Sequence, residues 1–165
     1  MKKKFNKKEH IINSLIKKEI LSIQENYLDN QAILIESFKI VQKYYGWVSD
    51  RSLIFLSKIL KIPVSNLESV ATFYSQIFRN PVGRYVVKFC DSVVCYVTGY
   101  KNIKSTLEKE LKIKCGETTK DNNFTLLPIC CLGACDRSPV VMINNKTYFS
   151  VTKKSIIKLL DSLKK

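Results

Sequence analysis

Two short cysteine-rich stretches constrain this chain more than any other feature. They read FCDSVVCYVTGY over residues 89–100 and PICCLGACDRSP over residues 128–139, and they hold five of the six cysteines. A four-cysteine zinc site or an iron–sulfur centre takes four thiolates. One thiol is therefore surplus, and the fold must bring two separate segments to one place. The five residues are Cys90, Cys95, Cys130, Cys131 and Cys135.

The spacing favours a [2Fe-2S] centre, because each of its two irons takes two terminal thiolates and each stretch supplies a pair. A four-cysteine zinc site remains the alternative. A Rieske centre needs two histidines, and His10 is the only one. The second pair is either Cys130-x4-Cys135 or Cys131-x3-Cys135, with Gly133 available to turn the loop. Neighbouring residues leaving a strand point to opposite sides, so we expect the surplus thiol to be a small buried residue.

Composition narrows the class of protein. The chain has 165 residues, of which 45% are apolar and 25% charged, as expected of a folded globular protein, and its net charge is +14. Most of its basic residues are lysines, which argues against nucleic-acid binding and favours a basic surface facing acidic partner subunits. No apolar run is long enough for a membrane helix and no signal peptide is visible, so we expect a cytoplasmic protein. Clustered cysteines there favour metal or redox chemistry over disulfides.

The first half of the chain is predicted to be all helix. Apolar spacing indicates helices over residues 8–28, from residue 31 to a C-terminal Gly46, and over residues 50–60. Ser65 and Glu68 match a capping box that opens a short helix. In this helix we expect Phe73 to pack into the core, and the alternative is that residues 71–74 form an interface patch.

The pattern changes near residue 81. We expect strands over residues 84–90 and 124–129, with a helix over residues 102–111 between them. A hairpin turning at Asn144 and Asn145, and a last helix capped by Thr152, follow. The predicted fold class is α+β: an N-terminal helical bundle over residues 1–80, then a thioredoxin-like βαββα domain over residues 81–165. Each cysteine stretch follows a strand, so both loops can meet at one end of the sheet.

Two longer stretches carry a resemblance to a known family. They are ESVATFYSQIFRNPVGRYVVKFCDSVVC over residues 68–95 and FTLLPICCLGACDRSPVVMI over residues 124–143. Both closely resemble the thioredoxin-like [2Fe-2S] ferredoxin family, as it occurs in bacterial NADH-quinone oxidoreductase, respiratory complex I. The resemblance covers roughly residues 30–165. It implies that Cys90, Cys95, Cys131 and Cys135 hold one [2Fe-2S] cluster, leaving Cys130 as the surplus thiol and Cys115 outside the pattern.

The same resemblance implies an electron-transfer subunit that does not oxidise NADH alone. Its cluster would exchange single electrons with FMN on a flavoprotein partner that oxidises NADH, beside other peripheral-arm subunits on the cytoplasmic side of the inner membrane. The five glycines never form G-x-G-x-x-G, so this chain shows no phosphate cradle of its own. Alternatives are the related subunit of an NAD-linked hydrogenase or formate dehydrogenase, and a structural zinc module. Backbone N–H groups, Asp91 and Asp136 would tune the cluster potential, or the two carboxylates serve only as turn residues.

Overall fold

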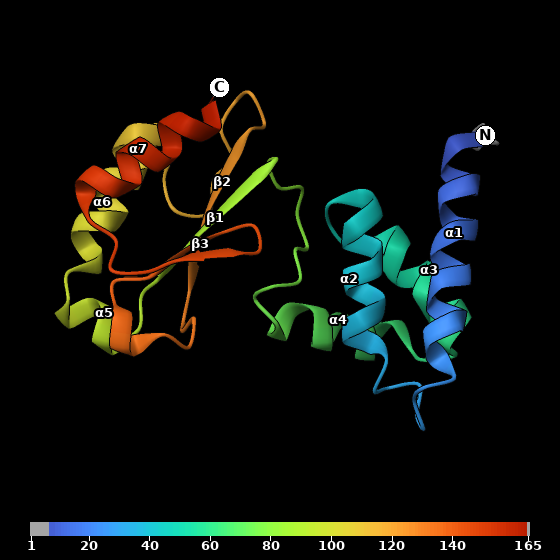
Figure 1. The fold of residues 1–165 in the computed structure, drawn as a ribbon. Helices are drawn as coiled ribbons and strands as arrows, with labels where there is room; N and C mark the ends of the chain where they lie inside the picture. The colour runs from blue at the N-terminus through green and yellow to red at the C-terminus, as the bar shows by residue number, and fades with distance from the viewer. Residues whose placement is uncertain (1–6, 165) are drawn as a thin grey trace. The chain divides into compact units, whose positions relative to one another are not determined.

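The computed structural model describes residues 7–164, and it divides the chain into two compact units, residues 1–81 and 82–165 (Figure 1). The first unit is helical, with α1 at Lys7–Gln24, α2 at Leu34–Tyr45, α3 at Asp50–Leu60 and α4 at Val64–Phe73. Apolar side chains from all four helices form its core. Among its fully buried members are Ile16, Ile20, Ile33, Phe38, Leu53, Leu56, Leu60 and Leu67.

Two of the predicted helix ends are confirmed by their capping geometry. Gly46 ends α2 in the left-handed region, at φ 80°, and its amide donates to the Gln42 carbonyl. The Ser49 side chain opens α3 by accepting from the Ser52 amide at 3.2 Å. The first helix ends at Gln24, four residues before the predicted end. The chain turns there because the Gln24 side chain donates to Asn30, which in turn donates to the Leu60 carbonyl.

The capping box predicted for α4 is wrong. Ser65 lies inside the helix, which begins at Val64 directly after Pro63, and no side chain caps it. Proline fixes its own φ near the helical value and so starts the helix without a polar cap. Glu68 is instead paired with Arg79, at 2.8 Å between Oε2 and Nη2.

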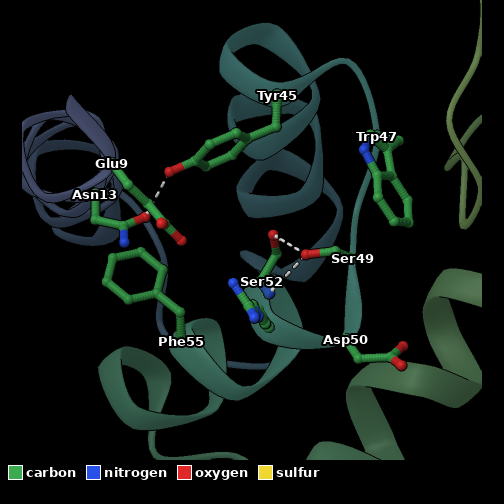
Figure 2. Close-up of a pocket in the computed structure, with 9 residues that line it drawn as sticks. Glu9, Asn13, Tyr45, Trp47, Ser49, Asp50, Ser52 and Phe55 are labelled. Carbon is green, nitrogen blue, oxygen red and sulfur yellow. Dashed lines mark hydrogen bonds between the residues drawn. The ribbon is translucent and has the colours of Figure 1, made fainter. Parts of the chain in front are cut away.

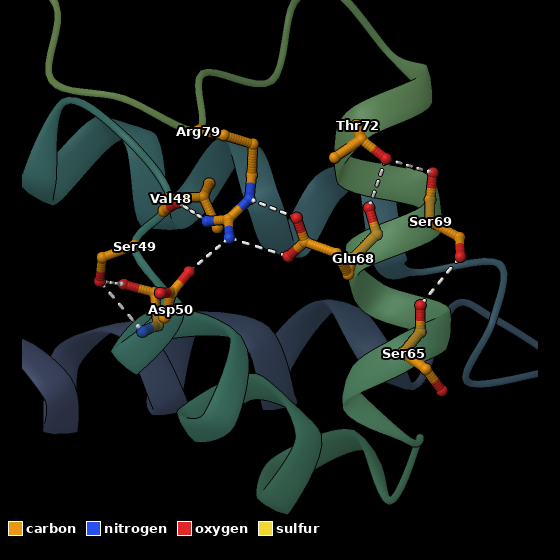
Figure 3. Close-up of polar contacts among 9 residues, drawn as sticks. Val48, Ser49, Asp50, Ser65, Glu68, Ser69, Thr72 and Arg79 are labelled. Atoms are coloured by element: carbon orange, nitrogen blue, oxygen red, sulfur yellow. Dashed lines mark hydrogen bonds and ion pairs between the residues drawn. The ribbon is translucent and has the colours of Figure 1, made fainter.

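Arg79 ties the end of the first unit to two helices (Figure 3). Its guanidinium donates to the Val48 carbonyl, to Asp50 at the start of α3 and to Glu68 in α4. The Gln42 side chain also hydrogen-bonds to the main chain of the segment that carries Arg79, at Gln76 and Phe78. These bonds hold residues 76–79 against the bundle.

The second unit is built on a four-stranded sheet in the order β2-β1-β3-β4. The strands are β1 at Tyr85–Cys90, β2 at Phe124–Ile129, β3 at Val141–Ile143 and β4 at Lys146–Tyr148. β1 and β2 run parallel, whereas β3 is antiparallel to both β1 and β4. Asn144 turns the β3–β4 hairpin with φ 51°, as predicted.

Helices cover one face of this sheet (Figure 1). α6 at Tyr100–Leu111 packs on β1 and β2, and α7 at Lys153–Lys164 packs against α6 and shares the same core. Thr152 caps α7 as predicted, accepting from the Ser155 amide at 3.2 Å. The order differs from βαββα in two respects. A short helix α5, at Val93–Val97, precedes α6, and the sheet has four strands because the predicted hairpin itself forms both β3 and β4. Within residues 7–164, no helix is long and apolar enough to cross a membrane. The core between the sheet and its helices contains Val87, Phe89, Ile103, Leu107, Leu126, Val141, Ile156 and Leu160.

Candidate metal centre

The parallel pairing of β1 and β2 brings the two cysteine stretches to one edge of the sheet. Cys90 is the last residue of β1, and its register partner, Ile129, is the last residue of β2. Cys130 and Cys131 follow immediately. Because parallel strands end at the same edge, the expectation that both loops meet there is confirmed.

Cys90 and Cys95 form a buried pair, with 2% and 1% of their surfaces exposed. Cys95 lies on the inward side of α5. Burial is the main cause that raises the pKa of the Cys95 thiol, to about 11, and the hydrogen bond with the Cys90 thiol adds to it. Without a bound metal the Cys95 sulfur is protonated at neutral pH, so loading a metal there must release a proton.

Cys131 and Cys135 form a second, exposed pair. Gly133 turns the loop between them with φ 73°, and its amide donates to the Cys131 Sγ at 3.3 Å. The hydrogen bond with Cys131 is the largest cause that raises the pKa of Cys135. The predicted turn at Gly133 is therefore present, together with one N–H group directed at a sulfur.

The two pairs lie close enough to affect each other. Cys135 contributes to the raised pKa of Cys95, and Cys90 contributes to that of Cys135. In the part of the chain that the structure describes, no group of three or more histidines, cysteines, aspartates and glutamates is arranged to hold one metal ion. In the type and number of their donors, the two thiol pairs match the set that a [2Fe-2S] cluster takes, two sulfurs to each iron.

The expectation that the surplus thiol is a small buried residue is wrong, because Cys130 and Cys131 are both exposed. β2 ends at Ile129, and the strand alternation on which the prediction relied no longer applies beyond it. Cys130 contributes its carbonyl instead, which accepts from the Cys90 Sγ at 3.8 Å. Cys115 is half-buried at the edge of the second unit's core and takes no part in either pair.

Three further residues that the sequence singled out are exposed. Asp91 and Asp136 are exposed, and Asp136 lies 3.3 Å from the Arg137 guanidinium, which offsets its charge. Phe73 was expected in the helical core, but 79% of its surface is exposed, so that prediction is wrong. It lies at the last turn of α4, edge-on to the Tyr74 ring at 5.1 Å. The apolar surface of α5 was not anticipated at all.

A separate hollow of about 460 Å³ lies in the helical unit (Figure 2). Its polar groups bond to one another: the Tyr45 hydroxyl donates to Asn13 Oδ1 at 3.0 Å, and the Ser49 and Ser52 hydroxyls lie 3.0 Å apart. None of the residues that line it is a cysteine. The paired thiols of the second unit are therefore the stronger candidate for chemistry.

Comparison with known proteins defines the class to which this fold and site belong. Residues 20–164 match the family model of the thioredoxin-like [2Fe-2S] ferredoxins, and the chain belongs to this family. The match begins within α1 and thus includes most of the helical unit as well as the cysteine-bearing unit.

Individual relatives give a more specific result than the family model does. The E subunit of NADH-quinone oxidoreductase from Buchnera aphidicola subsp. Acyrthosiphon pisum is 56% identical over 153 residues, which cover 91% of this chain and 94% of that protein. The Pseudomonas aeruginosa protein of the same name is 48% identical, over 83% and 82% of the two chains. A crystal structure of an NAD+-reducing [NiFe]-hydrogenase matches with a TM-score of 0.70 and 23% identity, over 80% of this chain and 22% of that one. That likeness shows the fold alone.

Proposed function

We propose that this chain is the electron-transfer E subunit of an NADH-quinone oxidoreductase, respiratory complex I. The observation that carries the proposal is the identity of 48% and 56% to proteins of that name over most of both chains. The hydrogenase-type subunit is the second candidate, but its support is a likeness of fold at 23% identity. A structural zinc module does not account for membership of a [2Fe-2S] family.

In this proposal Cys90, Cys95, Cys131 and Cys135 hold one [2Fe-2S] cluster, the cofactor that characterises the family. When bound, the cluster supplies single-electron transfer. The chain itself determines the surroundings of the cluster. The buried pair excludes water from one side, the Gly133 amide donates to a sulfur, and the exposed pair leaves the other side open to a partner.

The partner carries the rest of the chemistry. We assign FMN and the NADH site to a flavoprotein subunit, since this chain has no glycine-rich phosphate loop. We further propose that residues 1–80 and 81–165 are separate domains within the thioredoxin-like ferredoxin arrangement. The subunit then lies at the periphery of the complex, beside the flavoprotein and other peripheral-arm subunits, on the cytoplasmic side of the inner membrane.

The test begins with the full-length chain, loaded with iron and sulfide under reducing conditions. Metal and sulfide analysis should give the iron and sulfide of one [2Fe-2S] cluster, with an EPR signal that appears on reduction. NADH should reduce this cluster only when the FMN-bearing flavoprotein subunit is added. A colourless protein that retains zinc and gives no EPR signal would support the zinc module instead. Reduction by the flavoprotein of a hydrogenase, but not by that of complex I, would favour the second candidate.

A further inference from the structure

Lys88 is a charged residue in the interior of the second unit. Among the residues that the structure describes, it is the only charged one that is buried, with 4% of its surface exposed. Its register partners are Leu127 in β2 and Met142 in β3, which are both apolar. An apolar residue would suit this level of the sheet without the cost of taking a charge out of water. Packing alone therefore does not explain a lysine at this position.

Lys88 lies on the same face of the sheet as Cys90. Side chains alternate along a strand, and Val87 and Phe89 belong to the core that contains residues of α6 and α7. Lys88 and Cys90 are therefore on the opposite face, where Cys90 packs with Cys95. Two residues along a strand are about 7 Å apart, so the main chain of Lys88 is close to that of Cys90. A buried basic residue thus adjoins the buried thiol pair.

The acidic residues that adjoin the cysteines in sequence are exposed instead. Asp91 and Asp136 both lie at the surface, and Asp136 is paired with Arg137. Water and salt screen such charges, whereas a buried charge acts through a medium of lower dielectric constant and has a stronger effect at the same distance. We therefore expect the charge of Lys88 to influence Cys90 more than the two carboxylates do.

We propose that the charge of Lys88 raises the reduction potential of the cluster that Cys90 helps to hold. This inference rests on the proposed function and deepens it, because it assigns a residue that sets the potential for electron exchange. Reduction by one electron adds one negative charge, and a cation nearby stabilises the reduced form. Asp91 and Asp136 act in the opposite direction, and screening makes their effect smaller.

The experiment measures the midpoint potential of full-length, cluster-loaded variants by redox titration followed by EPR. Lys88→Met removes the charge and should favour the oxidised form about tenfold, a shift of about 59 mV to more negative potential for one electron. Lys88→Arg keeps the charge and should stay within about twofold, or about 18 mV. The matched control is Lys146→Met, the same substitution at an exposed lysine of β4. It should also stay within about 18 mV.

A second neutral variant keeps the test valid if Lys88→Met folds poorly. Lys88→Gln lacks the charge but can still form hydrogen bonds, and it should shift the potential in the same direction. Iron content and far-UV circular dichroism show which variants retain the cluster and the fold. A lowered stability with an unchanged potential would mean that Lys88 serves the fold alone, which would overturn the inference.

The outcomes separate this inference from the proposed function. If the neutral variants hold a cluster with the potential of the unaltered chain, the inference is wrong while the proposed function stands. The same shift in Lys88→Arg or in Lys146→Met would attribute it to packing or to overall charge and would also overturn the inference. So would loss of the cluster from both neutral variants, because Lys88 would then be needed to build the site. The expected shift, in a chain whose cluster the flavoprotein does not reduce, would support the inference and contradict the proposed function.

Discussion

Cys130 and Cys131 are adjacent in sequence and both exposed, so burial does not distinguish a ligand from a bystander. Their hydrogen bonds do distinguish the two residues. The Cys131 sulfur accepts from the Gly133 amide, the kind of bond that tunes a metal-bound sulfur. Cys130 takes part through its carbonyl, which any residue would supply equally well. The local bonding therefore supports Cys131 as the ligand.

The matched pair Cys131→Ala and Cys130→Ala tests this assignment. We expect Cys131→Ala to lose the cluster, because one iron is left without a thiolate. Cys130→Ala should keep the cluster and change the free energy of unfolding by less than about 0.5 kcal/mol, since its side chain is exposed. Iron content and the EPR signal after reduction provide the measurement. A cluster that survives Cys131→Ala but not Cys130→Ala would reverse the assignment.

At Gly83 the constraint is a lack of space for any side chain. A Cβ there would lie 2.9 Å from the main-chain atoms Asn123 C and Phe124 N, where β2 begins. The Gly83 amide also donates to the buried Thr125 hydroxyl at 2.6 Å. Any side chain at this position must push the start of β2 away from the segment that leads into β1.

Gly83→Ala should therefore lower the free energy of unfolding of the second unit by about 2–3 kcal/mol. Gly116→Ala is the control. Its Cβ meets open space, so only its φ of 93° opposes the substitution, and the cost should be about 1 kcal/mol. Denaturant unfolding followed by far-UV circular dichroism measures both. Equal costs at the two positions would show that the close approach at Gly83 relaxes without penalty.

At the scale of elements, the sequence predicted what local rules determine. The strand over Phe124–Ile129 and the end of α2 at Gly46 agree with the structure, because apolar pattern and glycine geometry act within a few residues. The capping-box error has a local and a distant cause. Pro63 starts α4 ahead of Ser65, and Arg79, eleven positions after Glu68, pairs with the Glu68 carboxylate.

The position of the candidate site could be predicted from the sequence to the same extent as the helices and strands. Pairing of parallel strands follows from the pattern and places the two cysteine loops together. α5 could not be predicted, because its outward face is apolar and its inward residue is a cysteine, the reverse of the usual helical pattern. The exposed Phe73 is a second exception to the rule that apolar residues on a helix face the chain's own core.

The Arg79 network gives a test at this scale. Arg79→Met removes the partner of the Val48 carbonyl and both ion pairs, so the helical unit should lose about 1–3 kcal/mol of stability. Arg84→Met is the control, because Arg84 is exposed and its guanidinium lies over the Tyr85 ring, at 5.3 Å. Thermal unfolding of the two variants should show a clear fall in Tm for Arg79→Met alone. An unchanged Tm would mean that water replaces the guanidinium at Val48.

At the scale of the whole molecule, each unit has its own apolar core. Core residues of the helical unit fall between Ile16 and Ile77, whereas those of the second unit fall between Val87 and Leu160. Every thiol of the two pairs belongs to the second unit. The family match nevertheless includes both units, so the helices are part of what members of this family share. Because none of the paired thiols lies in the helical unit, we propose that this unit serves assembly with partner subunits.

Removing the helical unit tests what each of the two units contributes to cluster binding and to assembly. A fragment of residues 81–165 should fold and bind a cluster with the EPR spectrum of the full chain, because it contains the complete sheet, the core and all the thiols. It should no longer co-purify with the flavoprotein subunit, because it loses the helical unit that we propose for assembly. If the helices merely shield one face of the second unit, the fragment will aggregate. Co-purification of a soluble fragment at full affinity would place the entire interface on the cluster-bearing unit.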